Sequence, residues 1–240
     1  MSIRVRNKIY EGTTKILYET QDEYIIVQFF KDTIKINEQV IEISGKGVLN
    51  NQISAAIMSK LDFIGIDNHF IDKVNMREQI VQFVDIIPIK VTVNNIAYGK
   101  YVSDFGVEEG YVFNKPIIDL KYKQEGLITP VNENQAINLG LVSGGKEIKN
   151  IQTQAYRIND FLTGIFAAIG FKLASCDLEF GVVFNGEEFV AMLADEISPD
   201  TCVLFDSYNY QNEDYTPEIP IQTVSLYLYQ EIAKRLKYML

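Results

Sequence analysis

The chain has 240 residues, a formal net charge of −10 and a hydrophobic fraction of 47%. This composition is that of an ordinary globular protein, long enough for one large domain or two small ones. The negative charge argues against a nucleic-acid-binding surface, which usually carries a basic face, but it leaves room for a small anionic substrate.

The sequence indicates neither a targeting signal nor a covalent framework. Cys176 and Cys202 are its two cysteines, and they predict no disulfide network. Residues 1–8 lack the apolar core of a signal peptide. No apolar run approaches the roughly 18–20 residues that span a bilayer. We therefore expect a cytoplasmic protein with no membrane partner and no nucleic-acid partner.

The apolar pattern predicts strands in groups around a few helices. In chain order these are strands at 8–10, 14–20 and 24–30, a helix at 47–61, strands around 69–74 and 80–96, a helix at 147–169, a hairpin at 178–194 and a helix from about 223 to 240. Regular alternation of strand and helix is missing. The pattern therefore favours an α+β fold over a doubly wound parallel sheet.

A glycine turn lies between the first two predicted strands, in Glu11-Gly12-Thr13-Thr14-Lys15. Glycine lets the backbone approach a phosphate, hydroxyl and amide groups bond its oxygens, and a lysine neutralises its charge. A glycine turn that simply joins two strands has the same appearance. The motif alone leaves both interpretations open.

Two further lysines lie where an anion can be bound. Lys46, between Gly45 and Gly47, opens the predicted helix at 47–61, and helix N-termini attract anions. A loop with an ordinary N-cap is the alternative there. Lys100 follows the strand end at Asn94-Asn95, where the alternative is a solvated strand end. The single histidine, His69, lies beside apolar residues, and we expect it to be structural.

Two acidic segments flank the predicted hairpin. Leu178-Glu179-Phe180-Gly181 begins it, and Asp195-Glu196-Ile197-Ser198-Pro199-Asp200 follows it. Strand interiors rarely carry carboxylates, because an ionised acid removed from water needs a partner. Two acids brought together by a hairpin suit Mg²⁺, which prefers hard oxygen ligands and phosphate. Glu179 and Asp195 are therefore the predicted metal ligands.

The metal hypothesis makes a prediction about the hairpin loop. A two-residue loop at Asn185-Gly186 places Glu179 opposite Met192 and turns Asp195 to the other face. A three-residue loop places Glu179 opposite Leu193, with Asp195 on the same face along a diagonal of roughly 7–8 Å. A metal site therefore predicts the three-residue loop.

Six segments, in order from Lys8 to about Asp206, together resemble the SAICAR synthetase family. They are Tyr10-Glu11-Gly12-Thr13-Thr14-Lys15, Lys46-Gly47-Val48-Leu49-Asn50-Asn51, Val84-Asp85-Ile86-Ile87-Pro88, Val131-Asn132-Glu133 and the two acidic segments. The last two are specific, and six ordered matches are hard to explain by chance. The resemblance implies a two-lobed α+β fold, with an antiparallel N-terminal ATP-binding lobe at 1–83, a larger α+β lobe at 84–240 and ATP in the cleft between them.

The resemblance also implies an activity: an ATP-dependent ligase of purine biosynthesis that joins L-aspartate to carboxyaminoimidazole ribonucleotide. Its partners are these small molecules and ATP, and the family often forms dimers, which suggests a homodimer. The implied catalytic residues are Lys15, Glu179 and Asp195, the last two as Mg²⁺ ligands. The implied ATP contacts are Gly12, Thr13, Lys15, Ile80, Val81 and Gln82. The implied substrate contacts are Lys46, Asn95, Lys100 and Asp200.

The chain departs from the family pattern mainly where the family binds the ribonucleotide phosphate and aspartate. Thr13, Asn94, Asp177 and Val203 stand where the family carries cations, and no basic segment lies at 209–215. Lys100 replaces a serine of the family, Phe205 replaces a tryptophan, and Ile128-Thr129 replaces an Asp-Pro pair. The family carries arginine at positions 94 and 203 and in the missing basic segment. Each charge-assisted hydrogen bond is worth roughly 1.5–3 kcal/mol, so the loss of three arginines without replacement is expected to weaken anion binding by several orders of magnitude.

Lys100 recovers part of this loss, whereas Asp177 is expected to work against it. The alternatives are therefore a diverged homologue that binds Mg-ATP but acts on another substrate, and one that has lost catalysis.

Overall fold

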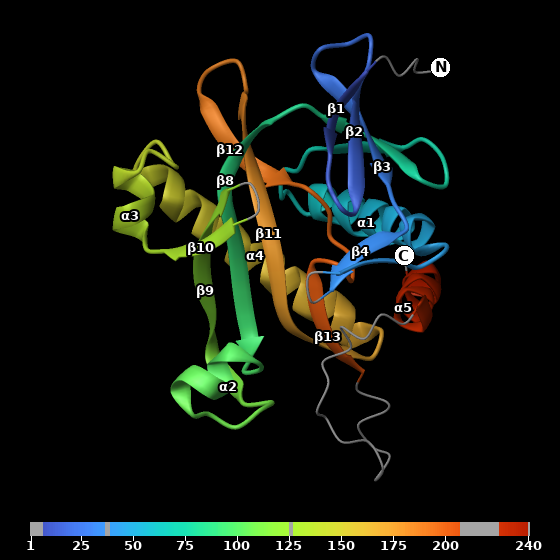
Figure 1. Cartoon of the computed structure of the whole chain (residues 1–240). Helices are drawn as coiled ribbons and strands as arrows, with labels where there is room; N and C mark the ends of the chain where they lie inside the picture. The colour runs from blue at the N-terminus through green and yellow to red at the C-terminus, as the bar shows by residue number, and fades with distance from the viewer. Residues whose placement is uncertain (1–6, 37–38, 125–126, 207–225, 240) are drawn as a thin grey trace. The chain divides into compact units, whose positions relative to one another are not determined.

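The computed structural model describes residues 7–36, 39–124, 127–206 and 226–239, which form two compact units (Figure 1). Unit 1 comprises Met1–Val84, Glu196–Asp200 and Val224–Leu240, and unit 2 comprises Asp85–Asp195 and Thr201–Thr223. Every strand pairing among the described residues is antiparallel. The α+β fold class is therefore confirmed, while the lobe limits at 1–83 and 84–240 stay a prediction.

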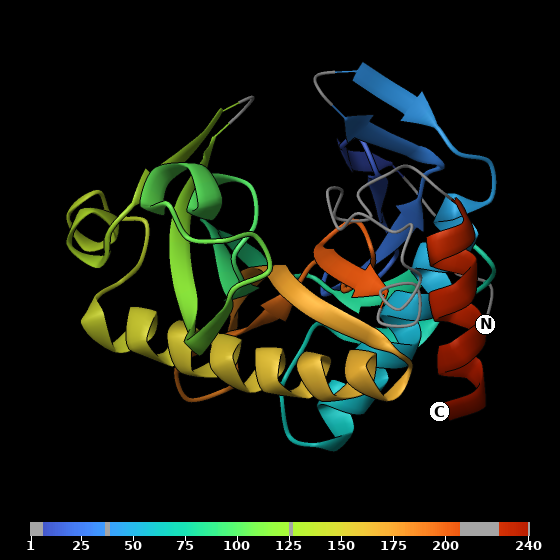
Figure 2. The ribbon, with the colours of Figure 1, turned by 90° about the horizontal axis from the view of Figure 1, so that it is seen from below.

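Unit 1 is built on an antiparallel sheet with the strand order β1-β2-β3-β7-β6. Its strands are β1 (Lys8–Glu11), β2 (Lys15–Glu19), β3 (Ile25–Phe30), β6 (Phe70–Lys73) and β7 (Glu78–Gln82), and a separate hairpin is formed by β4 (Thr33–Ile36) and β5 (Gln39–Glu42). Helix α1 (Lys46–Phe63) packs on the sheet through Ile53 and Ile57, which are fully buried. Helix α5 (Leu226–Met239) lies alongside α1 (Figure 2).

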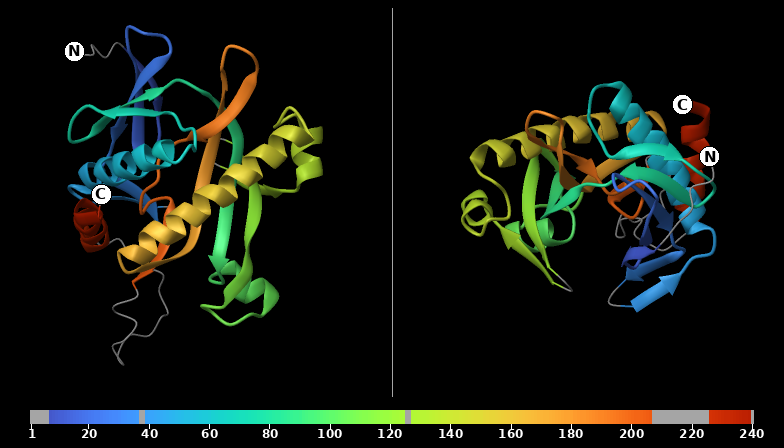
Figure 3. Two further views of the ribbon diagram at one scale, coloured as in Figure 1. Left: turned by 180° about the vertical axis from the view of Figure 1, so that it is seen from behind. Right: turned by 90° about the horizontal axis from the view of Figure 1, so that it is seen from above.

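Unit 2 is built on a second antiparallel sheet with the order β10-β9-β8-β11-β12, and β13 also pairs with β11. These strands are β8 (Asp85–Ile96), β9 (Val112–Gln124), β10 (Leu127–Val131), β11 (Phe171–Phe184), β12 (Phe189–Ala194) and β13 (Cys202–Asp206). Two short helices, α2 (Lys100–Phe105) and α3 (Glu133–Asn138), lie in the connections. The long helix α4 (Gly145–Ala168) crosses one face of the sheet (Figure 3, left).

The two faces of the unit 2 sheet differ in chemistry because side chains alternate along each strand. Val91, Val93, Cys176 and Leu178 are buried on the face that α4 covers, and Cys176 Sγ contacts Asn159 of that helix. The alternate positions of β8, β9 and β11 form what we call the polar face. Its residues are Lys90, Thr92, Asn94, Asp119, Lys121, Lys123, Ser175, Asp177 and Glu179.

The predicted helices at 47–61 and 147–169 are present as α1 and α4, because their apolar residues recur at helical spacing and pack on a sheet. Residues 223–225 and 240 of the helix predicted at 223–240 lie outside the described residues, and residues 226–239 form α5. The strand predicted at 80–96 is divided into β7 and β8 at Phe83-Val84. None of the helices in the described parts of the chain has both the length and the apolar character of a membrane-spanning segment.

Both predicted loop lengths of the hairpin are wrong. Phe184 pairs with Phe189 and Glu179 pairs with Ala194, so the loop has four residues, from Asn185 to Glu188. The side chain of Asn185 builds this turn from within, because its Oδ1 accepts the backbone N–H groups of residues 187 and 188 at 2.9 Å each. Packing of the Phe184 and Phe189 rings, whose centroids lie 5.4 Å apart, stabilises the same register.

Candidate active site

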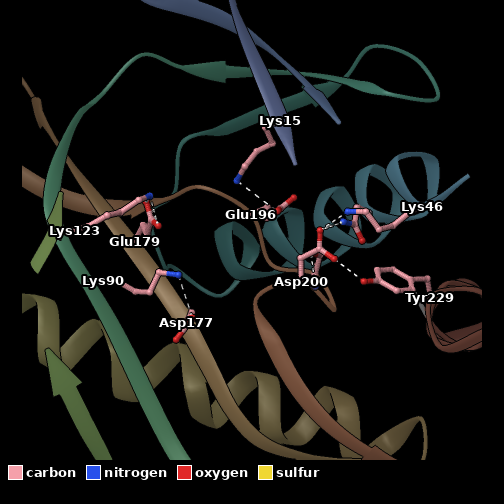
Figure 4. Close-up of polar contacts among 11 residues, drawn as sticks. Lys15, Lys46, Lys90, Lys123, Asp177, Glu179, Glu196, Asp200 and Tyr229 are labelled. Atoms are coloured by element: carbon pink, nitrogen blue, oxygen red, sulfur yellow. Dashed lines mark hydrogen bonds and ion pairs between the residues drawn. The ribbon is translucent and has the colours of Figure 1, made fainter. Parts of the chain in front are cut away.

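Glu179, a predicted metal ligand, lies inside β11 on the polar face of unit 2 and is 8% exposed. Lys123 of β9 reaches across β8, and its Nζ lies 2.6 and 2.8 Å from the two carboxylate oxygens of Glu179 (Figure 4). The Lys123 side chain is itself 43% exposed. A buried carboxylate thus has a cation as its partner, and that cation is exposed enough to withdraw into solvent.

Asp195, the second predicted metal ligand, directly follows Ala194, which pairs with Glu179. Its φ of 63° lies in the left-handed region, where it is alone among the non-glycine residues that the structure describes. Aspartate tolerates this conformation better than most residues, and such backbone positions cluster at functional sites.

The chemistry of the Glu179 and Asp195 carboxylates decides whether a metal ion fits them. In the described residues, no group of three or more His, Cys, Asp or Glu side chains is arranged to hold a metal ion. Mg²⁺ needs no such group, because one or two carboxylates with phosphate and water complete its coordination. The three-residue loop that the metal hypothesis predicted is not formed, because Glu179 pairs with Ala194, the residue just before Asp195. The two side chains still offer the hard oxygen donors that this ion prefers, so the donor types fit it.

The predicted phosphate turn joins β1 and β2 in unit 1. Its backbone is anchored from neighbouring segments, since Gly12 O accepts from Lys31 Nζ at 3.1 Å and Thr13 O accepts from the Thr33 hydroxyl. A side chain at position 12 would place its Cβ 2.9 Å from the Tyr10 hydroxyl oxygen. The three residues predicted to meet adenine, Ile80, Val81 and Gln82, lie in β7 between β3 and β6.

Lys15, the lysine of this turn, faces Glu196 in unit 1, and its Nζ lies 3.5 Å from Glu196 Oε1. Burial raises the pKa of Glu196 and the charge of Asp200 adds to this, while the charges of Lys15 and Lys46 act in the opposite direction. His69 is buried nearby. Burial, followed by the charge of Lys15, lowers its pKa to about 3, so the imidazole is neutral at physiological pH. This agrees with a structural histidine.

Lys46 and Asp200, both predicted substrate contacts, are partners of each other inside unit 1 (Figure 4). Lys46 Nζ lies 2.5 Å from Asp200 Oδ2, and its side chain is fully buried. Asn50 donates to the same oxygen at 2.8 Å, and the hydroxyl of Tyr229 in α5 donates to Asp200 Oδ1 at 2.6 Å. This network ties the segment 196–200 to α1 and α5.

The N-terminus of α1, where the sequence indicated an anion, is occupied by the chain's own Asp32. The Asp32 carboxylate accepts from the backbone N–H groups of Gly45 and Gly47 at 3.1 and 2.9 Å. Arg77 donates to both of its oxygens at 2.8 Å, which is the main reason that the pKa of Asp32 is lowered to about 2. Gly47 is required here, because a Cβ would lie 2.4 Å from Phe30 O.

In unit 2, Asn95 exchanges two amide hydrogen bonds with Asn159 of α4, at 2.8 and 2.9 Å, while Lys100 begins α2 and is exposed. Asp177 was expected to repel an anion, but two neighbouring side chains, Lys90 and Thr92, contact its carboxylate. Asp177 Oδ2 lies 3.2 Å from Lys90 Nζ, and its Oδ1 accepts from Thr92 at 2.6 Å. The negative charge of Asp177 is therefore compensated within the sheet.

Sequence reasoning missed Lys90, Lys121, Lys123, Asp32 and Tyr229. The available signal was weak: Lys121 and Lys123 alternate with Leu120 and Tyr122, as in a strand with one polar face. That segment forms β9, which the sequence analysis did not predict.

Comparisons with known proteins cover most of the chain. The sequence model of the family described as SAICAR synthetase matches residues 8–228. A phosphoribosylaminoimidazole-succinocarboxamide synthase of Rickettsia bellii is 50% identical over 203 residues, which are 84% of this chain and 86% of that protein. The synthase of the same name from Rickettsia felis is 45% identical and covers 97% of this chain and 99% of its own length.

The solved structures that this chain resembles belong to the same family as the sequence relatives. The crystal structure of the Ehrlichia chaffeensis synthase has a TM-score of 0.86 and 36% identity, over 96% of this chain and 98% of that one. A SAICAR synthetase in complex with ADP has a TM-score of 0.82 and 30% identity, over 95% of this chain and 97% of that one. The chain belongs to the SAICAR synthetase family.

Proposed function

We propose that this chain is an ATP-dependent carbon–nitrogen ligase that joins L-aspartate to carboxyaminoimidazole ribonucleotide in purine biosynthesis. The observation that carries this proposal is the 50% identity to the Rickettsia bellii synthase over 84% of this chain and 86% of the relative. No observation favours the alternatives of another substrate or of lost catalysis.

The chemistry follows from the weakness of a carboxylate as an electrophile. A carboxylate oxygen of the ribonucleotide attacks the terminal phosphorus of ATP, and ADP leaves. The amine of aspartate then attacks the acyl carbon, the carbon–nitrogen bond forms, phosphate leaves with the bonding electron pair, and the amine loses a proton. Catalysis of this kind depends mostly on positioning and on charge neutralisation.

The nucleotide is assigned to residues of unit 1. We propose that Lys15 binds ATP phosphate with the backbone at Gly12 and Thr13, and that the backbone at 80–82 meets adenine. Two observations support this assignment: a relative of 30% identity binds ADP, and Glu196 holds the Lys15 ammonium at 3.5 Å. Positioning of that ammonium before the nucleotide arrives reduces the entropy lost on binding.

The metal is assigned to unit 2, where Glu179 and Asp195 would hold Mg²⁺. When bound, the ion supplies charge neutralisation for phosphate oxygens. Glu179 contributes a buried carboxylate whose counter-ion, Lys123, is 43% exposed and free to withdraw. Asp195 contributes a carboxylate on a left-handed backbone at the end of β12.

The remaining residues predicted at the substrate, Lys46, Asn95, Lys100 and Asp200, are assigned different roles. Lys100 is exposed and is assigned a direct contact, whereas Asn95, whose amide is paired with Asn159 of α4, is assigned a supporting role. Lys46 and Asp200 act by holding the segment 196–200 in place, because both are buried in a shared network. We also propose a homodimer in the cytoplasm. The buried Cys176 and Cys202 are not joined in a disulfide, which suits that reducing compartment.

An assay with ATP, Mg²⁺, L-aspartate and carboxyaminoimidazole ribonucleotide tests the proposal. We expect ADP release and ligated product that depend on all four components, and loss of both in Glu179→Gln. Binding of Mg-ATP without product would contradict the assigned reaction but leave nucleotide binding intact. Absence of ATP binding would contradict the proposal as a whole.

A further inference from the structure

Among the residues that the structure describes, Lys121 is the lysine of the polar face that has no carboxylate partner. Lys123 is paired with Glu179, and Lys90 is paired with Asp177. Lys121 Nζ instead donates to the neutral hydroxyl of Thr92 at 2.8 Å. No ion pair of Lys121 with a carboxylate is found in the described part of the chain.

The hydroxyl of Thr92 fixes the direction of Lys121. Thr92 is 4% exposed, and its single hydroxyl proton is donated to Asp177 Oδ1 at 2.6 Å. A hydroxyl that gives its proton in one direction presents a lone pair in another, and Lys121 donates to that lone pair. An ammonium carries three donors, so the contact with Thr92 leaves two donors of Lys121 for another acceptor.

The remaining carboxylate of the polar face is satisfied without Lys121. Asp119 Oδ2 accepts from Asn94 Nδ2 at 3.0 Å and from the Tyr101 hydroxyl at 2.9 Å. Burial, together with Asp119, raises the pKa of Tyr101, so its hydroxyl keeps the proton that it donates. The hydrogen bonds to Asp119 therefore come from the neutral groups of Asn94 and Tyr101. Because Asp119 does not bind Lys121, the ammonium of Lys121 stays available for a ligand.

We propose that Lys121 binds an oxyanion, a carboxylate or phosphate group of the non-nucleotide substrates, on the polar face of unit 2. Thr92 and Asp177 are positioning residues that aim its ammonium, and Lys90 compensates the charge of Asp177. The inference rests on the proposed ligase function, since it names a substrate contact of that reaction.

Lys121→Met tests the proposal, because methionine keeps most of the apolar stem and removes the charge. We expect the KM for either L-aspartate or carboxyaminoimidazole ribonucleotide to rise roughly 10- to 100-fold, the loss of one charge-assisted contact. The substrate whose KM rises identifies the source of the oxyanion. The KM for ATP is expected to stay unchanged, and a rise confined to ATP would overturn the proposal.

Lys115→Met is the matched control. Lys115 is exposed on the same strand, β9, about 20 Å from Lys121 at the usual rise per residue, so all three KM values should match those of the unmodified chain. For the positioning role, Thr92→Val should raise the same KM as Lys121→Met, and Thr92→Ser, which keeps the hydroxyl, should restore it. Equal KM values in the valine and serine variants would remove Thr92 from the proposal.

Calorimetric titration of the two substrates, in the absence of ATP, separates this inference from the proposed function. If the unmodified chain binds a substrate and Lys121→Met binds it at least 10-fold more weakly, the inference holds even where no turnover is seen. If turnover is normal but both KM and affinity are unaffected by Lys121→Met, the inference fails while the ligase function stands. If neither substrate binds, the inference fails as well.

Discussion

The ammonium of Lys123 lies 2.6 and 2.8 Å from the two carboxylate oxygens of Glu179, across the strand that separates them. This contact lets a strand interior hold an ionised acid, because the cation compensates for the water that burial removes.

Replacement of Glu179 by glutamine should lower kcat about 100-fold or more, because the neutral amide no longer supplies charge to a metal and leaves Lys123 without its counter-ion. Steady-state kinetics measure kcat, and titration with Mg-ATP measures the loss of metal-dependent affinity. Glu187→Gln, an exposed change in the loop of the same hairpin, is the control. Activity within about threefold of the unmodified chain would contradict a catalytic Glu179.

Two substitutions of Asp195 separate its charge from its backbone. Asp195→Asn and Asp195→Ala should both lose activity, because both remove the carboxylate. Alanine should in addition lower the free energy of unfolding by about 1 kcal/mol, since it tolerates the left-handed φ of 63° less well than asparagine. Urea unfolding of both variants measures the difference. Equal stabilities would show that the left-handed backbone carries no strain.

Tyr229→Phe should lower the free energy of unfolding by about 1–3 kcal/mol, because Asp200 Oδ1 then loses a buried hydrogen-bond donor. Burial, together with the charge of Asp200, raises the pKa of Tyr229, so the hydroxyl is protonated and donating at neutral pH. Tyr227→Phe, exposed on the same helix, should change stability by less than about 0.5 kcal/mol. A similar urea midpoint for the two variants would rule out a stabilising role for the Tyr229–Asp200 contact.

Asp32 should make stability depend on pH in acid. The pKa of Asp32 is lowered from 3.8 to about 2 in the folded chain, chiefly by Arg77. A depressed carboxyl pKa stabilises the fold above the unfolded value, and this contribution is lost as the pH falls from about 4 to about 2. Urea unfolding measures the free energy of unfolding across this pH range, and its decrease on acidification should be smaller in Asp32→Asn than in the unmodified chain. At pH 7, Asp32→Asn should be less stable than the unmodified chain by about 1–2 kcal/mol. An identical pH dependence in both proteins would contradict the assignment.

The elements that the sequence predicted well are those with strong local periodicity. Helices α1 and α4 lie within two residues of their predicted limits at each end, because α4 carries an apolar stripe that any packed arrangement must bury and α1 carries Ile53, Ile57 and Leu61 four residues apart. The short helices α2 and α3 and strands β9 and β10 have no comparable stripe. Their positions depend on neighbouring strands, which a single sequence does not reveal.

The hairpin shows the limit of local reasoning about the acidic pair. The turn signal at Asn185-Gly186 was correct, but the loop length depends on the Asn185 side chain and on the contact between Phe184 and Phe189. The placement of Asp195 depends in turn on the register and on a left-handed residue at the strand end. The acids could be found from the sequence, but their relative geometry could not.

The sequence by itself determined which groups are present: the ordered motifs of the family, the carboxylates of Glu179 and Asp195, and the missing family cations. The tertiary structure decided which charges are neighbours. Lys90 and Asp177 are 87 residues apart, and Lys46 and Asp200 are 154 apart, yet each pair is in direct contact. Coulomb interactions depend on distance in space, and that distance is set by strand order and helix packing rather than by position in the chain.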